Sequence, residues 1–461
     1  MPSSAPFLSP IPRAINTEDL SQRIKDQTVS QPFTFSGFEF QKPVNFCGIR
    51  FENGVEFRRC IFHESVNFSG ARFQGYARFW KCIFKKPADF KYAVFQKLET
   101  GALGSTENGE ANLSWSRFEQ DADFLWAKFE GPVFFWRTVF EKFAKLEATF
   151  RSSAVFEGDP RLVCIERGDL GSYAGLLDGL DKAGLLFQDT EDHNCAMLSP
   201  IADQNAFEEK LKAVGFNADS VNQVRSVLRR LQAGVFSAAG ASFRGAHFDE
   251  PEAIIFRNLS LQACRFIDSN AGRAKFQNVQ WDRQPTLLLA SDRRAVYDER
   301  PAGSATELSI EELRSLSTLY NDLRVGHEER GLFDDAIDFQ YGEIESKRLG
   351  QSIALRHISL VAWYRYLSAY GARPGLALFW LLLGIFVLFP ILYWLTGYSH
   401  LAVDAIVHSL ETSTFLEASK SSETLKNLSI ATRLVAGFER LAVTFQAALF
   451  ALAIQRKFGR K

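Results

Sequence analysis

Large apolar residues recur every five or six positions through the first third of the chain, separated by polar and charged residues. After Phe35 the steps alternate between six and five, and a small or β-branched residue usually stands two positions before each aromatic residue. Neither the helical period of 3.6 nor the strand period of 2 produces this spacing. The pattern therefore predicts a repeating unit of five residues, rather than a long amphipathic helix or a β-meander.

A five-residue unit fits a four-sided coil in which each unit forms one side. One large and one small residue of each unit point inward, and the others face water. Four sides make a turn of roughly 20 residues, and about 21 units give about five turns stacked at roughly 4.8 Å, the spacing of hydrogen-bonded strands. The residues predicted to fill the interior are Phe40, Phe46, Phe51, Phe57, Phe62, Phe68, Phe73, Phe79, Phe84, Phe90, Phe95, Phe118, Phe124 and Phe129.

The repeat resembles a known family. The stretches VNFCGIRF, VNFSGARF and ADFKYAVF are similar to the Phe-centred variant of the pentapeptide-repeat family. This resemblance implies a right-handed quadrilateral β-solenoid over residues 33–159. A less regular block over residues 236–285 carries Phe243, Phe248, Phe256 and Phe266, and it either completes the same solenoid or forms a separate one.

The remaining segments before the C-terminal region lack the five-residue period. Residues 1–32 are rich in Pro and Ser and are predicted to be disordered, and residues 97–110 are predicted to be a loop. Residues 160–235 are predicted to be a helical insertion, with apolar stripes over 207–214 and 221–231. Residues 305–350 are predicted to be a helical hairpin with a break at Gly331. This stretch is similar to the helices that join repeats to membrane helices in bacterial pentapeptide-repeat proteins.

Residues 373–461 are predicted to be a membrane module with two spans, about 374–395 and 434–454, preceded by an interfacial helix at 351–372. The first span carries no formal charge and is long enough to cross the hydrocarbon core, with a kink expected at Pro390. The second span contains Glu439 and Arg440, and a charge at mid-bilayer costs roughly 2.5–3.5 kcal/mol. Trp363, Tyr366, Tyr370, Tyr393 and Trp394 are predicted to lie at the membrane interface.

Basic residues precede the first span and follow the second, which predicts that both ends of the chain are cytoplasmic. The N-terminus lacks the pattern of a signal peptide. The predicted location is therefore the inner membrane, in a multi-pass topology. Two spans with a polar connection also resemble the pore unit of two-helix cation channels. The segment 404–416 is similar to a pore helix, but LEASKSSETL replaces the Gly-rich selectivity filter.

Composition and motifs narrow the function. The 461 residues include 43 Phe but only 2 Met, and the net charge of −1 favours no nucleic-acid partner. The sequence lacks the GxxxxGK[ST], HExxH and GxSxG motifs, so no enzyme activity, cofactor or metal is predicted. Cys60, Cys82 and Cys264 stand at small inward positions of the repeat. His193 with Cys195 is interpreted as an ordinary surface or core pair, and His400 and His408 as solvated loop residues.

These features together predict a membrane-anchored, non-enzymatic scaffold or interaction protein whose repeats are presented in the cytoplasm. Its expected partners are the lipid bilayer, an unknown cytoplasmic protein and, through the membrane helices, a second copy of the chain. The alternative is a channel-like or transport-associated protein whose two-span module is gated or assembled by the repeats.

Overall fold

The computed structural model describes residues 13–14, 28–29, 33–96, 109–158, 162–164, 180–188, 195–198, 204–215, 217, 236, 240–286, 292–300, 307–398, 402–414 and 429–459. The chain divides into two compact units. The solenoid unit comprises residues 1–282 and 296–298, and the helical unit comprises residues 283–295 and 299–461.

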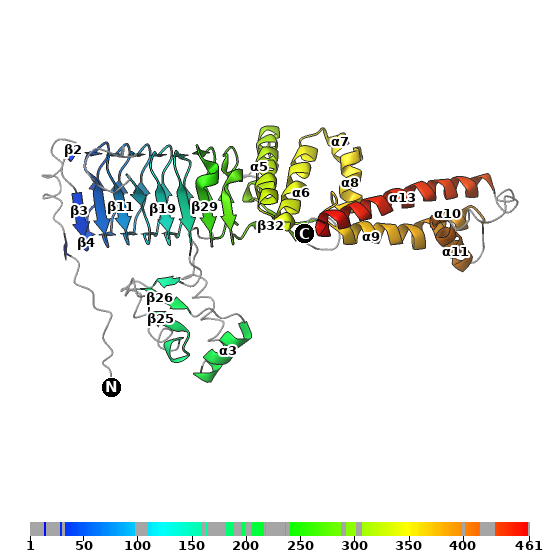
Figure 1. Cartoon of the computed structure of the whole chain (residues 1–461), viewed down its shortest axis with the longest axis horizontal. Coiled ribbons are helices and arrows are strands. Elements are labelled where there is room, and N and C mark those ends of the chain that lie inside the picture. Colours follow the sequence, from blue (N-terminus) through cyan, green and yellow to red (C-terminus); the bar gives the residue numbers. More distant parts are fainter. Residues whose placement is uncertain are drawn as a thin grey trace. The chain divides into compact units, whose positions relative to one another are not determined.

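Short strands stack in register into four parallel sheets, which form the four walls of a β-solenoid (Figure 1). Sheet A contains β1 (Arg13–Ala14), β4 (Phe38–Phe40), β8 (Ile61–Phe62), β12 (Ile83–Phe84), β16 (Arg117–Phe118) and β20 (Val139–Phe140). Sheet B contains β2 (Thr28–Val29), β6 (Arg50–Phe51), β10 (Arg72–Phe73), β14 (Val94–Phe95), β18 (Lys128–Phe129), β22 (Thr149–Phe150) and β28 (His247–Phe248). Sheet C contains β3 (Phe33–Ser36), β7 (Val55–Arg58), β11 (Ala77–Trp80), β15 (Ala111–Asn112), β19 (Val133–Trp136), β23 (Ala154–Glu157), β29 (Ile254–Arg257) and β31 (Lys275–Gln277). Sheet D contains β5 (Val44–Asn45), β9 (Val66–Asn67), β13 (Ala88–Asp89), β17 (Ala122–Asp123), β21 (Ala144–Lys145), β27 (Ala241–Ser242) and β30 (Cys264–Arg265).

Phenylalanine rings stack along the interior because each coil places the same position above its counterpart in the coil before. The rings of Phe46, Phe68 and Phe90 lie 4.8 and 5.0 Å apart and nearly parallel. The other walls repeat this arrangement, as in the pair Phe40 and Phe62 at 4.6 Å. All fourteen phenylalanines predicted to fill the interior are at most 2% exposed.

The second repeat block continues the same solenoid. Strands β27, β28 and β29 pair in parallel with β21, β22 and β23 of the first block. The alternative of a separate second solenoid is therefore excluded. Sheet C reaches eight strands: the first block supplies six, one more than the five turns expected from it, and β29 and β31 of the second block add two. Two short 3₁₀ helices, η1 (Pro251–Ala253) and η2 (Ala271–Arg273), interrupt this block.

The prediction of disorder for residues 1–32 needs correction at two dipeptides. Strand β1 pairs with β4, and β2 pairs with β6. An edge strand offers unpaired backbone N–H and C=O groups, which short extended segments can satisfy without any repeat pattern of their own. The rest of this segment lies outside the described residues, as does most of the predicted loop 97–110.

The insertion at 160–235 was predicted to be helical, but its described residues also contain strands. Its described residues include an antiparallel sheet of β24 (Leu162–Cys164), β25 (Leu186–Gln188) and β26 (Cys195–Leu198), followed by helix α3 (Gln204–Ala213). Apolar runs of three or four residues are too short for periodicity to separate strand from helix. The predicted stripe over 221–231 lies outside the described residues.

The helical unit begins with a two-stranded sheet and a helical hairpin. Its elements are β32 (Asp282–Pro285), β33 (Asp292–Ala295), η3 (Tyr297–Glu299), α5 (Ile310–Glu329) and α6 (Phe333–Leu349), of which β32 and η3 lie partly in the solenoid unit. Ser309 and Glu312 form a capping box at the start of α5. Gly331, between the two helices, adopts a φ of +73°. Gly342, within α6, has no room for a side chain because the ring of Tyr320 of α5 packs against it.

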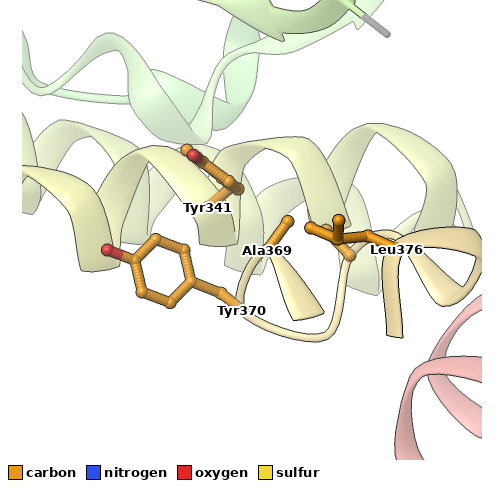
Figure 2. Close-up of a cluster of buried hydrophobic side chains, with 5 residues drawn as sticks. Tyr341, Ala369, Tyr370 and Leu376 are labelled. Carbon is orange, nitrogen blue, oxygen red and sulfur yellow. The ribbon is translucent and has the colours of Figure 1, made fainter. Parts of the chain in front are cut away.

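The segment 351–372 contains two short helices rather than the single interfacial helix that was predicted. Helix α7 (Ile353–Ile358) ends where the extended Ser359 begins α8 (Leu360–Ser368), and the Ser359 hydroxyl caps α8 by accepting from the N–H of Ala362. Ser is a favoured N-cap residue, so it starts a new helix here. After α8, Ala369, Tyr370, Ala372 and Leu376 pack with Tyr341 of α6 in the cluster of Figure 2.

Two helices of the helical unit are long and apolar enough to cross a membrane, at Pro374–Leu395 and Ile430–Phe458. The first consists of α9 (Pro374–Leu383), a π-helical turn η4 (Gly384–Leu388) and α10 (Phe389–Leu395), and the second is α13 (Ile430–Phe458). Near the start of α9, Gln446 of α13 donates to the carbonyl oxygen of Ala377 at 2.8 Å. Helix α11 (Ala402–Ser413) packs against α10 of the first long helix and against α13.

Candidate functional site

One corner of the solenoid, between sheets C and A, carries large side chains on unusual backbone conformations. Arg59, Lys81, Trp115 and Arg137 follow successive strands of sheet C, and their φ values of 54–62° lie in the left-handed region. Gly37 occupies the same corner in the first coil, where it costs no strain. A residue with a Cβ atom pays roughly 1–2 kcal/mol for this conformation. Retaining long basic and aromatic side chains there points to a role for those side chains.

The side chains at this corner interleave cations with indole rings along the axis of the solenoid. The Nζ atom of Lys81 lies 4.5 Å from the ring centre of Trp80 and 4.9 Å from that of Trp115. The guanidinium of Arg137 lies 4.3 and 4.7 Å from the ring centres of Trp115 and Trp136. We call this array the basic–aromatic ladder, and it consists of Arg58, Arg59, Trp80, Lys81, Trp115, Trp136 and Arg137.

The ladder combines a fixed geometry with an excess of positive charge. Lys81 and Trp115 are each only 8% exposed, so their mutual contacts hold the array in place, whereas Arg58 and Arg59 are exposed. The seven side chains of the ladder include four cations and no carboxylate, and Glu56 beside the ladder contacts Arg58 at 3.6 Å. Stacked guanidinium groups retain their N–H donors for bidentate contact with carboxylates. The array is therefore suited to bind an acidic segment.

Sequence reasoning did not identify this ladder, because the solenoid brings together residues from different coils. Trp80 is the register partner of Arg58, and the N–H of Trp115 bonds to the carbonyl oxygen of Trp136. Residues 97–108, which lack the repeat pattern, also shift the count between coils. Writing the repeat one coil per row would have aligned these residues at the corner that follows sheet C.

A second, smaller aromatic feature occupies the corner between sheets D and B. Tyr92 and Trp126 are 53% and 59% exposed, and their rings lie 5.2 Å apart. Both residues have positive φ, at 56° and 58°. Lys91 beside them is paired with Asp89 and Asp123, both at 3.4 Å. This corner has aromatic surface without the ladder's excess of positive charge.

The structure separates the aromatic residues predicted to lie at the membrane interface into two groups. Trp363 and Trp394 are 56% and 55% exposed, and Tyr366 is half-buried. Tyr370 and Tyr393 are buried within the protein, at 2% and 0% exposure, and their placement at the interface stays a prediction. The hydroxyl of Tyr370 donates to Glu345 at 2.7 Å, and that of Tyr393 donates to Glu439. A tyrosine with a hydrogen-bond partner can be buried as readily as it can lie at an interface.

The histidine and cysteine predictions have mixed outcomes. His408, predicted to be solvated, is 3% exposed, and its ring stacks on Tyr398 at 4.1 Å. His193 and His400 lie outside the described residues. Cys60, Cys82 and Cys264 are buried, and burial raises the pKa of Cys264, so this thiol stays neutral. Among the described residues no three His, Cys, Asp or Glu side chains gather as a metal site requires.

The family comparison identifies the repeat. A family model of pentapeptide repeats, nine copies long, matches residues 35–83 and 46–94. Comparison with curated proteins and with solved structures gave no significant match. The match covers the coils that form the first part of the ladder, from Arg58 to Lys81.

Proposed function

The chain carries a pentapeptide-repeat solenoid, and from this premise we propose that it is a membrane-anchored, non-enzymatic interaction protein. Its solenoid binds an acidic segment of a cytoplasmic protein along the basic–aromatic ladder. The observation that carries the proposal is the ladder itself, because its four cations contact indole rings and three of them, Arg59, Lys81 and Arg137, stand on strained backbone. The two long apolar helices would confine this surface to the bilayer.

The anchoring part of the proposal is supported by the direction of the apolar side chains on the two helices. Leu382, Phe386, Ile391, Leu434 and Phe445 are among those with more than a third of their surface exposed. Many large apolar side chains exposed on the same helices are typical of contact with lipid or another protein. Both helices also exceed the length of about 20 residues that spans a bilayer.

We expect the full-length protein to remain in the membrane pellet after washing with alkaline carbonate, which strips peripheral proteins. The reason is that two spanning helices bury their apolar side chains in lipid, whereas a surface attachment depends on charge. A peripheral protein of the same membranes, probed in parallel, serves as the control. Release of the full-length chain into the supernatant would contradict the anchor.

The binding part predicts selective affinity for acidic peptide. A fluorescent polyglutamate peptide should bind purified full-length protein in neutral detergent, and the double variant Arg59→Glu/Arg137→Glu should weaken this binding at least tenfold, about 1.4 kcal/mol. Added salt should weaken it as well, since the contacts are charged. Fluorescence anisotropy measures both effects.

The matched control reverses two charges on other walls, in the variant Lys86→Glu/Lys128→Glu. Both lysines are exposed and lie outside the ladder. This variant should bind polyglutamate within about threefold of the wild type, because its local field at the ladder is unchanged. Equal losses in the two variants, or equal binding of a neutral polyglutamine peptide, would show that the ladder does not select acidic segments.

A further inference from the structure

A carboxyl group is buried among the apolar helices of the helical unit. Glu439 is 0% exposed, although it lies on α13, one of the two helices long enough to cross a membrane. It follows the helix start at Ile430 by nine residues, which is about 14 Å along the helix axis. An ionised carboxylate at such a position is costly unless specific partners compensate for the lost hydration.

Glu439 has hydrogen-bond partners on two other helices. The hydroxyl of Tyr393 on α10 lies 2.5 Å from one carboxyl oxygen, and the hydroxyl of Ser409 on α11 lies 2.5 Å from the other. The same Ser409 oxygen lies 2.8 Å from the carbonyl oxygen of Ile385, in the π-helical turn η4. The three groups therefore form a chain from Glu439 through Ser409 to the backbone of the first apolar helix.

Pro390 explains why the carbonyl of Ile385 uses a side-chain donor. In η4 the N–H of Phe389 bonds to the carbonyl of Gly384, five residues earlier. The next bond of this series would run from residue 390 to Ile385, but proline has no N–H group. The Ser409 hydroxyl takes the place of that missing donor. Ser409 is 0% exposed, so this bond forms away from water.

Counting protons along the chain assigns the state of the carboxyl group. A serine hydroxyl has one proton and can donate one full hydrogen bond. If that bond is made to Ile385, the proton between Ser409 and Glu439 must come from Glu439. We propose that Glu439 is a proton-binding site of the apolar helices, where the neutral acid donates to Ser409, Ser409 donates to Ile385, and Tyr393 donates to the second oxygen.

The surroundings of helix α11 fit a neutral acid. Its buried face carries Ala405, His408, Ser409 and Thr412, whereas Val403 and Val407 are exposed. This arrangement, polar inside and apolar outside, is the reverse of that of a helix in water. Enclosed polar groups are stabilised by hydrogen bonds, and in the protonated chain the Ser409 hydroxyl both accepts from Glu439 and donates to Ile385.

Loss of the proton changes the contact between α11 and the first apolar helix. The carboxylate can only accept, so the Ser409 hydroxyl then donates to Glu439 and no longer to Ile385. The titratable and charged groups on the described elements around Glu439 are Tyr393 and Tyr398, then Asp404, His408 and Glu411 of α11, and Arg433 and Arg440 of α13.

Infrared spectroscopy of the full-length protein in lipid nanodiscs tests the assignment. The spectrum of the wild type minus that of Glu439→Gln should show the C=O band of a protonated carboxylic acid at neutral pH. This band should shift in D₂O and disappear at strongly alkaline pH. Carboxylate bands in its place at neutral pH would overturn the proposal.

Thermal unfolding in detergent supplies a second test. Glutamine at position 439 reproduces the neutral acid, since its amide donates to Ser409 and its oxygen accepts from Tyr393, and the midpoint should stay within about 1 °C of the wild type. Glu439→Ala leaves both hydroxyls without this partner, and the midpoint should fall by about 5 °C. A fall for Glu439→Gln as large as that for Glu439→Ala would overturn the proton chain.

Discussion

Replacing Phe68 with aspartate is expected to lower the free energy of unfolding of the solenoid by about 4 kcal/mol or more. The Phe68 ring is fully buried between those of Phe46 and Phe90. The substitution removes this packing and places a carboxylate among the rings of Phe46, Phe79 and Phe90, so a buried charge is added to the cavity. Chemical unfolding of the full-length protein, followed by the circular dichroism of the β-structure, measures the loss.

The control introduces the same residue one position earlier, in Asn67→Asp. The side chain of Asn67 points away from the interior and accepts from the N–H of Ser69 at 2.8 Å. Asp89 stands at the same register position in the next coil and accepts from the N–H of Lys91 in the same way. This variant should therefore unfold within about 0.5 kcal/mol of the wild type. A stable Phe68→Asp variant would show that the rings do not fill a closed interior.

The solenoid could be predicted from sequence because its geometry depends on local, repeated spacing. Each phenylalanine is followed by the next inward position after five or six residues, so the alternation of Phe46, Phe51 and Phe57 already defines the walls. Where the repeat weakened, as around Phe248, the pattern still indicated the residues that face inward. It did not indicate that β28 pairs with β22, since pairing between distant segments leaves no local signal.

Contacts between distant residues also explain what sequence reasoning missed at the candidate site. The ladder depends on register between coils, as with Trp80 and Arg58. The burial of Tyr370 and Tyr393 depends on glutamates 25 and 46 residues away. Tyrosine near an apolar segment is typical of a membrane interface as well as of a buried hydrogen bond, so composition alone could not separate the two.

Replacing Glu345 with alanine is expected to destabilise the helical unit by about 3–5 kcal/mol. Arg348, only 3% exposed, donates to both oxygens of Glu345 at 2.9 and 2.8 Å, and Tyr370 donates at 2.7 Å. Without the carboxylate, a buried guanidinium loses its counter-charge. The hydroxyl of Tyr370, a residue of the buried cluster shown in Figure 2, loses its acceptor as well. Thermal unfolding of the full-length protein in detergent measures this loss.

Glu343→Ala, on the same helix, is the matched control. Glu343 also contacts two cations, Arg324 at 3.1 Å and Lys347 at 2.6 Å, but the side chain of Lys347 is 61% exposed. Water can replace the carboxylate at the exposed Lys347, and Arg324 keeps a second carboxylate, that of Glu328 at 3.1 Å, so this variant should lose only about 1 kcal/mol. An equal loss in the two variants would show that the burial of Arg348 does not determine the cost.

The pH dependence of Glu345→Ala provides a second check on the same contact. Burial alone would raise the pKa of Glu345, but hydrogen bonds from Arg348 and Tyr370 and the charge of Arg365 lower it below its ordinary value of 4.5. The folded state therefore favours the carboxylate, and the stability that it contributes is present above that ordinary value and lost as the pH falls through the lowered pKa. The difference in unfolding midpoint between the wild type and Glu345→Ala should be full at neutral pH and should narrow in acid. A difference that stays constant or widens in acid would mean that Glu345 is not held in its ionised form by these partners.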